Sequence, residues 1–209
     1  MTSLKPLPRS FYARDTHHVA RALLGKVLVH QLKQQVLSGR IVEVEAYIGE
    51  DDLACHASRG RTPRTEIMYG EAGHAYIYLI YGMYYCCNIV TANKNFPAAV
   101  LLRALEPLTG IPLMEKNRPH VNKTTELASG PGKLTRALGI TKKLNNIDMV
   151  SDHTFFVADD GMIVPKTSIG TSSRIGVAYA GPCALYPWRY FIKDSPFVSK
   201  QKTATRSGL

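Results

Sequence analysis

The chain has 209 residues, with 26 lysines and arginines against 16 aspartates and glutamates, and its formal net charge is +10. That length suits one large domain with a substantial core, and the positive charge favours a polyanionic partner, although many basic proteins are only soluble. No apolar stretch approaches the roughly 20 residues of a membrane span or the core of a leader, and no Cys-x-x-Cys pair of zinc spacing occurs, so we expect a soluble intracellular protein without a structural metal.

The order of predicted elements favours an α+β domain. Residues 15–24 predict a helix with Asp15 as N-cap and Gly25 just past its end, and residues 26–32 and 39–47 alternate like paired strands. Further strands are predicted at 74–81, 84–91, 99–105, 153–157, 174–179 and 188–193, and further helices at 110–117 and 131–138. We expect a single domain over residues 1–199 with a curved, largely antiparallel sheet, and a basic, disordered tail over 200–209.

Two acids and an aromatic residue share one face of the strand over residues 40–47. Val42, Val44 and Ala46 alternate with Glu43, Glu45 and Tyr47, so each set occupies one face. One interpretation is a half-exposed strand with solvated glutamates. The other is a general base, because a protein that binds an anion has reason to keep acids out of its groove unless one performs chemistry.

A polar segment with one histidine and three arginines follows at residues 53–64. A lone histidine such as His56 is often a satisfied structural residue, and Arg59, Arg61 and Arg64 could form an ordinary solvated loop. The same arginines suit contacts with phosphate groups, which leaves both interpretations open.

Five of the eleven tyrosines fall within residues 76–85, around Gly82. Alternating aromatic and β-branched residues favour extended strands, and a glycine supplies the positive φ of a tight reversal, so we predict a protruding β-hairpin with Tyr81 near its tip. The tyrosines could pack into an aromatic sheet, or an exposed Tyr81 could stack on the bases of nucleic acid. Cys86 and Cys87, adjacent on the second strand, should point to opposite faces and remain unpaired.

Polar residues interrupt two apolar strands and open one helix. Burying Arg103 alone would cost several kcal/mol, which predicts an anionic partner, either structural or catalytic. For Asn88 a structural and a functional role are equally open, because a buried amide side chain could simply form hydrogen bonds with the backbone of a β-bulge. In residues 129–134, Ser129 is a candidate N-cap and Lys133 lies in the first turn, so this helix start could hold a phosphate or be an ordinary capped helix.

Taken together, residues 40–47, 76–88, 101–107 and 129–134, continued by 174–177 and 195–199, resemble the mammalian-type alkyladenine (3-methyladenine) DNA glycosylases. Each segment alone is weak evidence for this resemblance, but their combination in this order is specific. The resemblance spans residues 10–199. The resemblance implies a curved antiparallel sheet with a protruding hairpin, and a monomeric base-excision-repair enzyme that acts on double-stranded DNA without metal or cofactor. Such an enzyme would be cytoplasmic in a bacterium and nuclear in a eukaryote.

The resemblance also implies the role of each site residue. Glu45 would activate the water nucleophile, which Arg103 and the main-chain carbonyl of Ile175 would hold. The flipped base would stack between Tyr47 with His56 on one side and Tyr78 on the other, with Asn88 near its edge. Tyr81 would fill the space of the extruded nucleotide and Met83 would wedge the neighbouring pairs. The expected backbone contacts are Arg59, Arg61, Arg64 and Lys133.

The implied reaction is hydrolysis of the N-glycosidic bond of damaged purines, of the class that includes 3-methyladenine, 7-methylguanine, hypoxanthine and ethenoadenine, and leaves an abasic site. No amine nucleophile lies in these segments, which favours a monofunctional hydrolase over a lyase. The alternative is a non-catalytic module that binds damaged or distorted DNA. A metal-dependent hydrolase is disfavoured because no compact ligand motif occurs.

Overall fold

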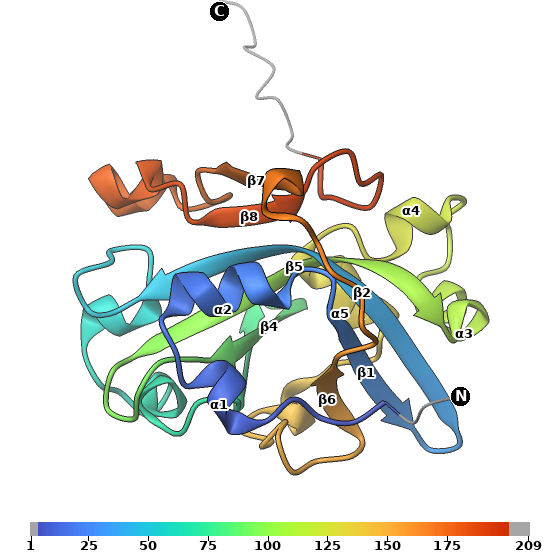
Figure 1. Cartoon of the computed structure of the whole chain (residues 1–209), viewed down its shortest axis with the longest axis horizontal. Helices are drawn as coiled ribbons and strands as arrows, with labels where there is room; N and C mark the ends of the chain where they lie inside the picture. The colour runs from blue at the N-terminus through green and yellow to red at the C-terminus, as the bar shows by residue number, and fades with distance from the viewer. Residues whose placement is uncertain (1–3, 201–209) are drawn as a thin grey trace, which may run out of the picture.

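An eight-stranded antiparallel sheet organises the chain, and the computed structural model describes residues 4–200 of it. Six strands follow the order β3-β4-β5-β2-β1-β6, and β8 joins β2 on one side and β7 on the other (Figure 1). The strands are β1 Val27–Leu32, β2 Gln35–Ile48, β3 Ala75–Ile80, β4 Tyr84–Val90, β5 Ala98–Thr109, β6 Phe155–Ala158, β7 Ile169–Ser172 and β8 Arg189–Ile192. This architecture confirms the predicted α+β fold.

The helices are short, and α2 and α5 pack against strands of the sheet. The α-helices are α1 Arg9–Tyr12, α2 Thr16–Leu23, α3 Ile111–Asn117, α4 Thr124–Leu127 and α5 Pro131–Ala137. The 3-10 helices are His56–Arg59, Glu66–Tyr69, Lys142–Leu144, Lys166–Ser168 and Ala178–Leu185. Among the described residues, none of these helices is long and apolar enough to cross a membrane.

The predicted caps of α2 explain its limits. The side chain of Asp15 accepts a hydrogen bond from the amide of His18 at 2.9 Å, which satisfies one free N–H of the first turn. After the helix, Gly25 adopts φ 86°, a conformation that glycine tolerates best. Val19, Ala20 and Leu23 are buried, so one face of α2 packs on the sheet.

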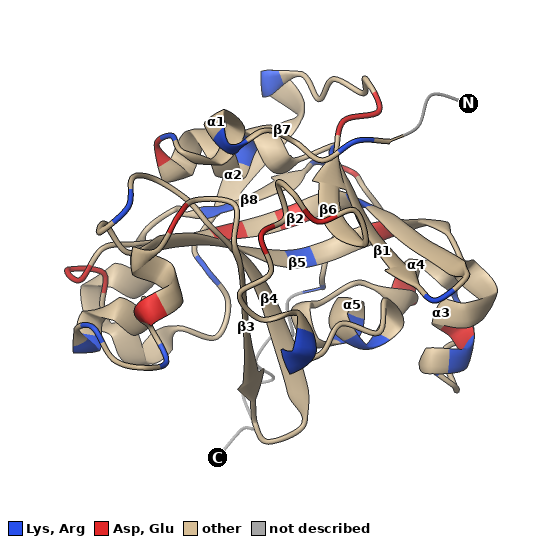
Figure 2. Ribbon diagram, turned by 90° about the horizontal axis from the view of Figure 1, so that it is seen from below, with Lys and Arg blue, Asp and Glu red and all other residues tan. Residues whose placement is uncertain are grey.

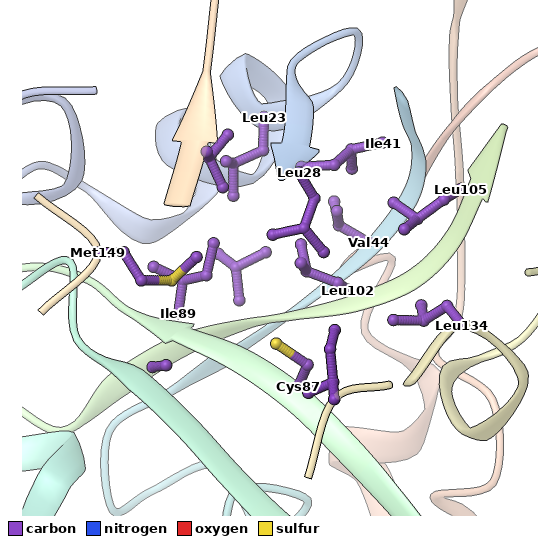
Figure 3. Packing of buried hydrophobic residues seen from close by; sticks show 14 of the residues in the cluster. Leu23, Leu28, Ile41, Val44, Cys87, Ile89, Leu102, Leu105, Leu134 and Met149 are labelled. Carbon is purple, nitrogen blue, oxygen red and sulfur yellow. The ribbon is translucent and has the colours of Figure 1, made fainter. Parts of the chain in front are cut away.

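The main hydrophobic core lies between the sheet and the helices. It takes Leu23 from α2, Leu28 from β1, and side chains from three central strands and α5 (Figure 3). The labelled residues from those elements and from the loop before β6 are Ile41, Val44, Cys87, Ile89, Leu102, Leu105, Leu134 and Met149. All are almost fully buried, and the site described below lies against the opposite face of β2.

Register shifts in β2 and β5 change one detail of the predicted pattern. The pairing of these strands shifts between Ile41 and Glu43 and again between Glu43 and Val44, as β-bulges do. Val44 and Ala46 join the main core as expected, but Ile41 joins it in place of Val42. A bulge alters strict alternation by one residue, which explains the difference.

The predicted hairpin is formed by β3 and β4, and it projects from the body of the protein beside α5 (Figure 2). Tyr81 at φ 52° and Gly82 at φ 68° occupy the turn, and the Met83 amide donates to the Ile80 carbonyl at 3.2 Å. Two consecutive positive φ values are typical of a type I′ turn.

Helix α5 supports the base of the hairpin through a close approach. A Cβ atom on Gly132 would lie 3.0 Å from the Cβ of Tyr84, so the absence of a side chain lets the helix sit against β4. The Thr135 hydroxyl also donates to the Tyr85 carbonyl at 2.9 Å. The hairpin is therefore held by α5 as well as by its own strand pairing.

Three expectations about local structure differ from the structure. Residues 174–179 do not form a strand, because Gly176 turns the chain at φ 79° and a 3-10 helix follows. Ser129 does not cap α5; Gly130 occupies the N-cap position without a side-chain hydrogen bond. The elements β7, α1 and α4 were not predicted, since each has only four residues and too few to show a period. The predicted tail lies outside the described residues from position 201.

Candidate active site and nucleic-acid interface

A pocket with a volume of about 520 Å³ opens at the base of the hairpin. Its walls include parts of β2, β3, β4, β5 and α5, the 3-10 helices over His56–Arg59, Glu66–Tyr69 and Ala178–Leu185, and the loop before Ala178. It brings together most of the predicted site residues, namely Tyr47, His56, Arg64, Tyr78, Tyr81, Asn88, Arg103 and Ile175. Segments that are distant in the sequence thus converge on one cavity.

Glu45 lies beneath this pocket and is fully buried. Its Oε1 accepts a hydrogen bond from the Ile175 amide at 2.7 Å. Its Oε2 accepts from Arg103 Nη1 at 3.1 Å and from the Tyr47 hydroxyl at 2.8 Å. Oε1 therefore accepts one hydrogen bond and Oε2 accepts two, so Oε1 keeps the larger remaining capacity to accept a hydrogen bond.

Of the two interpretations of the acids on β2, that of solvated glutamates is wrong, because the side chains of Glu43 and Glu45 have 0% exposure. Arg103 from β5 bridges them, since its Nε donates to Glu43 Oε1 at 3.0 Å while its Nη1 donates to Glu45. Burial would lower the pKa of Arg103, but the charges of Glu45 and Glu43 outweigh burial and raise it. The anionic partner predicted for Arg103 is confirmed. Figure 2 shows the acidic part of β2 beside the basic part of β5.

Ile175 contacts Glu45 through its backbone amide, whose N–H donates to Oε1. The role of the Ile175 carbonyl in holding the water stays a prediction. Arg174 holds this segment in place, because its guanidinium donates to both Asp52 oxygens at 2.5 and 2.7 Å and to the Ala46 carbonyl at 3.0 Å. Asp52 was missed by the sequence analysis, since it lies in an acidic run and its partner is 122 residues away.

The aromatic walls differ from the expected arrangement. The rings of His56 and Tyr78 are in edge contact, with centroids 4.5 Å apart and planes at 70°. No base fits between rings in direct contact, so His56 and Tyr78 form one wall, and Tyr47 is the remaining aromatic side chain of the expected sandwich. This corrects the expectation that His56 shares a side with Tyr47.

Hydrogen bonds fix the orientation of the wall residues. His56 Nδ1 is 2.8 Å from the Tyr76 hydroxyl, and the Asn88 Nδ2 donates to the Tyr76 carbonyl at 2.9 Å. Burial lowers the pKa of His56 to about 4, with the charges of Arg64 and Arg59 acting in the same direction. The His56 ring is therefore neutral near pH 7.

The adjacent cysteines of β4, Cys86 and Cys87, face opposite sides of the strand, as predicted. Both are buried and unpaired. Cys86 lines the pocket, whereas Cys87 packs in the main core. Burial raises the pKa of the Cys86 thiol, so this wall of the pocket is uncharged near neutral pH.

Large side chains stand exposed at the mouth of the pocket. Tyr81 at the hairpin tip is 78% exposed and Met83 beside it is 67% exposed. Tyr179, from the 3-10 helix over Ala178–Leu185, also lines the pocket and is 72% exposed. Tyr179 was missed, because it lay in a segment predicted as a strand.

The basic side chains predicted to contact DNA are exposed, but they differ in their surroundings. Arg64 lines the pocket, with its guanidinium 5.1 Å from the centre of the Tyr78 ring. Arg61 donates to both oxygens of Glu66, at 2.8 and 2.6 Å. Arg59 and Lys133 are exposed on the surface. Across residues 4–200, no three His, Cys, Asp or Glu side chains gather as a metal site would require.

Comparisons with known proteins agree on one family. The family model described as "Methylpurine-DNA glycosylase (MPG)" matches residues 10–196. Proteins named "Putative 3-methyladenine DNA glycosylase" are similar to this chain along almost its whole length. The one from Methanocella arvoryzae is 54% identical over 195 residues, covering 93% of this chain and 96% of the relative. Those from Bacillus cereus strain G9842 (49% over 202 residues, 93% and 98% covered) and Desulfitobacterium hafniense (47% over 204 residues, 94% and 99% covered) follow. The chain belongs to the methylpurine-DNA glycosylase family.

Proposed function

We propose that this protein is a monofunctional DNA glycosylase that extrudes a damaged purine from duplex DNA and hydrolyses its N-glycosidic bond. The family supports the reaction class. The observation that carries the mechanism is the buried Glu45 carboxylate, which accepts three hydrogen bonds and lies beneath an aromatic pocket. Such a carboxylate can take a proton from water and stabilise positive charge that develops on the sugar.

Aromatic stacking offsets the free-energy cost of extruding the base from the duplex. Taking a base out of the duplex costs a few kcal/mol, and each aromatic stack returns about 1–3 kcal/mol. Tyr81 is the exposed ring available to fill the vacated space, and Met83 lies beside it. The extruded base enters between Tyr47 and the wall formed by His56 and Tyr78.

The aromatic side chains of the pocket are electron-rich and uncharged near neutral pH. Burial, and next the charge of Glu45, keep the pKa of Tyr47 well above its usual range, and burial does the same for Tyr78. Neutral aromatic rings attract a cationic alkylated purine through cation–π interactions. For such a base the glycosidic bond is already weakened by the positive charge, so water activation and charge stabilisation at the sugar suffice.

Hydrolysis replaces the bond from the sugar to the base by a bond from the sugar to water oxygen. Water adds its oxygen to the anomeric carbon, the bond to the base nitrogen breaks, and the water proton passes to Glu45. The bonding electrons leave with the purine, which neutralises the positive charge of an alkylated base. Because Glu45 has no exposed surface in the free protein, Tyr47 or the Ile175 segment must move for water to reach Oε1.

A hydrolase rather than a lyase fits the pocket. A lyase needs an amine nucleophile at the sugar, and the described residues that line the pocket include no lysine. The protein therefore leaves an intact abasic site, and no strand break accompanies base release.

The test is a product profile on duplexes that each carry one lesion. Duplexes with 3-methyladenine, 7-methylguanine, hypoxanthine or ethenoadenine are incubated with the protein, and abasic sites are revealed by alkaline cleavage. We expect alkali-dependent strand breaks with at least one lesion, and none without alkali. Tight lesion binding with no product from any duplex would instead identify a non-catalytic module for damaged DNA.

A further inference from the structure

Glu43, which the mechanism does not use, is a buried acid that accepts four hydrogen bonds, one more than Glu45. Its Oε1 accepts from Arg103 Nε at 3.0 Å, Arg189 Nε at 2.6 Å and the Ser199 hydroxyl at 2.8 Å. Its Oε2 accepts from the Ser199 amide at 2.7 Å. Glu43 is fully buried and does not line the pocket, so it cannot touch substrate directly.

We propose that Glu43 is a positioning residue for Glu45. It acts through Arg103, and Arg189 and Ser199 hold it in place. This proposal rests on the proposed function of Glu45. It assigns a task to the segment ending at Ser199, which is 156 residues from Glu43 in the sequence.

The geometry of Arg103 supports this assignment. A guanidinium group is rigid and planar, so fixing Nε on Glu43 also fixes the direction in which Nη1 points. That atom donates to Glu45, the proposed base. The register shift between Glu43 and Val44 lies opposite Arg103, where bulges re-aim side chains.

The buried side chains of Glu43, Glu45, Arg103 and Arg189 have a net charge of zero together. Glu43 and Glu45 have 0% side-chain exposure, Arg103 has 7% and Arg189 has 5%. Two negative and two positive charges therefore share one water-poor region. Removing Glu43 leaves an excess positive charge near Glu45, whereas removing Arg189 leaves an excess negative charge.

Because removing Glu43 and removing Arg189 leave opposite net charges near Glu45, the two variants distinguish a positioning role of Glu43 from a merely structural one. An excess positive charge favours ionised Glu45, and an excess negative charge favours its protonated form. The titratable or charged groups that face Glu45 from the elements around it are Glu43 and Tyr47 on β2, Cys86 on β4, Arg103 on β5, Arg189 on β8, and Arg174 with its partner Asp52. A variant of Glu43 or of Arg189 changes only one of these groups.

The experiment compares pH–rate profiles for single-turnover excision from a lesion duplex. In Glu43→Gln the acidic limb should move to lower pH, and in Arg189→Met to higher pH, each by about one pH unit. Arg189→Lys keeps the charge and should return the limb to the wild-type position. If Glu43→Gln does not fold, the Arg189→Met and Arg189→Lys pair still tests the proposal.

Two control variants isolate the cause. Asp160→Asn changes the net charge by the same amount as Glu43→Gln but removes a partner of Arg40, at 2.8 Å, away from Glu45. Its profile should match wild type. Ser199→Ala removes one donor to Glu43 while all charges and the Ser199 amide remain, so its excision should slow without a displaced limb.

A readout without catalysis separates this proposal from the proposed function. The carboxyl carbon of Glu45 is titrated by NMR in the free protein, and its midpoint should move in opposite directions in Glu43→Gln and Arg189→Met. Absence of product with wild type overturns the proposed function. Midpoints or limbs that stay in place, or that move in the same direction in both variants, overturn the positioning role of Glu43.

Discussion

Replacing Arg103 by methionine should destabilise the fold severely. Arg103 is the link between Glu43 and Glu45, with donor distances of 3.0 and 3.1 Å, and all three side chains are at most 7% exposed. Removing one partner from a buried ion pair costs about 3–5 kcal/mol, because it leaves a buried charge without compensation. That is a large part of the roughly 5–15 kcal/mol that stabilises a typical domain.

Urea unfolding and thermal unfolding, each followed by circular dichroism and by the fluorescence of the single tryptophan, Trp188, measure this change. For a chain of this size each kcal/mol lowers Tm by about 2–4 °C, so we expect a decrease of about 6–20 °C. Arg103→Lys should recover part of the stability, because it restores the charge but not the planar fork.

An exposed ion pair provides the matched control. Lys94 lies 3.3 Å from Glu71, and their side chains are 63% and 50% exposed. Lys94→Met should therefore cost less than about 1 kcal/mol. If Arg103→Met lowers the free energy of unfolding by no more than Lys94→Met does, the reasoning about the buried network is refuted.

Three further predictions concern DNA binding and pH. Tyr81→Ala should weaken base extrusion by about 1–3 kcal/mol, as read from a fluorescent base beside the lesion, while Tyr81→Phe retains it; unchanged extrusion would contradict the wedge role. Lys133→Gln should reduce the slope of log affinity against log salt by about one, and an identical slope would remove Lys133 from the phosphate contacts. Because burial lowers the pKa of His56 from 6.5 to about 4, the unfolded chain binds its proton first, so stability should fall as pH decreases through that window. His56→Asn should flatten this dependence in urea unfolding at pH 7 and pH 5, and an equally steep fall would contradict it.

The arrangement of the site could be predicted where it follows from strand periodicity. Alternation along β2 put Glu45 and Tyr47 on one face, and the structure joins them by a hydrogen bond of 2.8 Å. An arginine in an apolar strand required an anionic partner, which Arg103 has. Gly82 indicated the hairpin turn, although Tyr81 adopts positive φ as well.

Long-range pairs could not be predicted in the same way. Asp52 with Arg174 and Glu43 with Ser199 are each joined across more than 100 residues, and neither local pattern contains a signal for the other. The atom of Ile175 that faces Glu45 depends on the turn at Gly176, which a strand prediction for 174–179 had excluded. The side of the pocket that His56 occupies likewise follows from its contact with Tyr78, which only the folded chain defines.

The central claim is that Glu45 activates water for base excision. It is tested most directly by single-turnover excision from lesion duplexes with wild type, Glu45→Gln and Glu71→Gln, an exposed acid whose partner is Lys94. We expect Glu45→Gln to lower the rate by about 10²–10⁴-fold, while Glu71→Gln keeps the wild-type rate. A Glu45→Gln protein that excises every lesion at the wild-type rate would contradict the account.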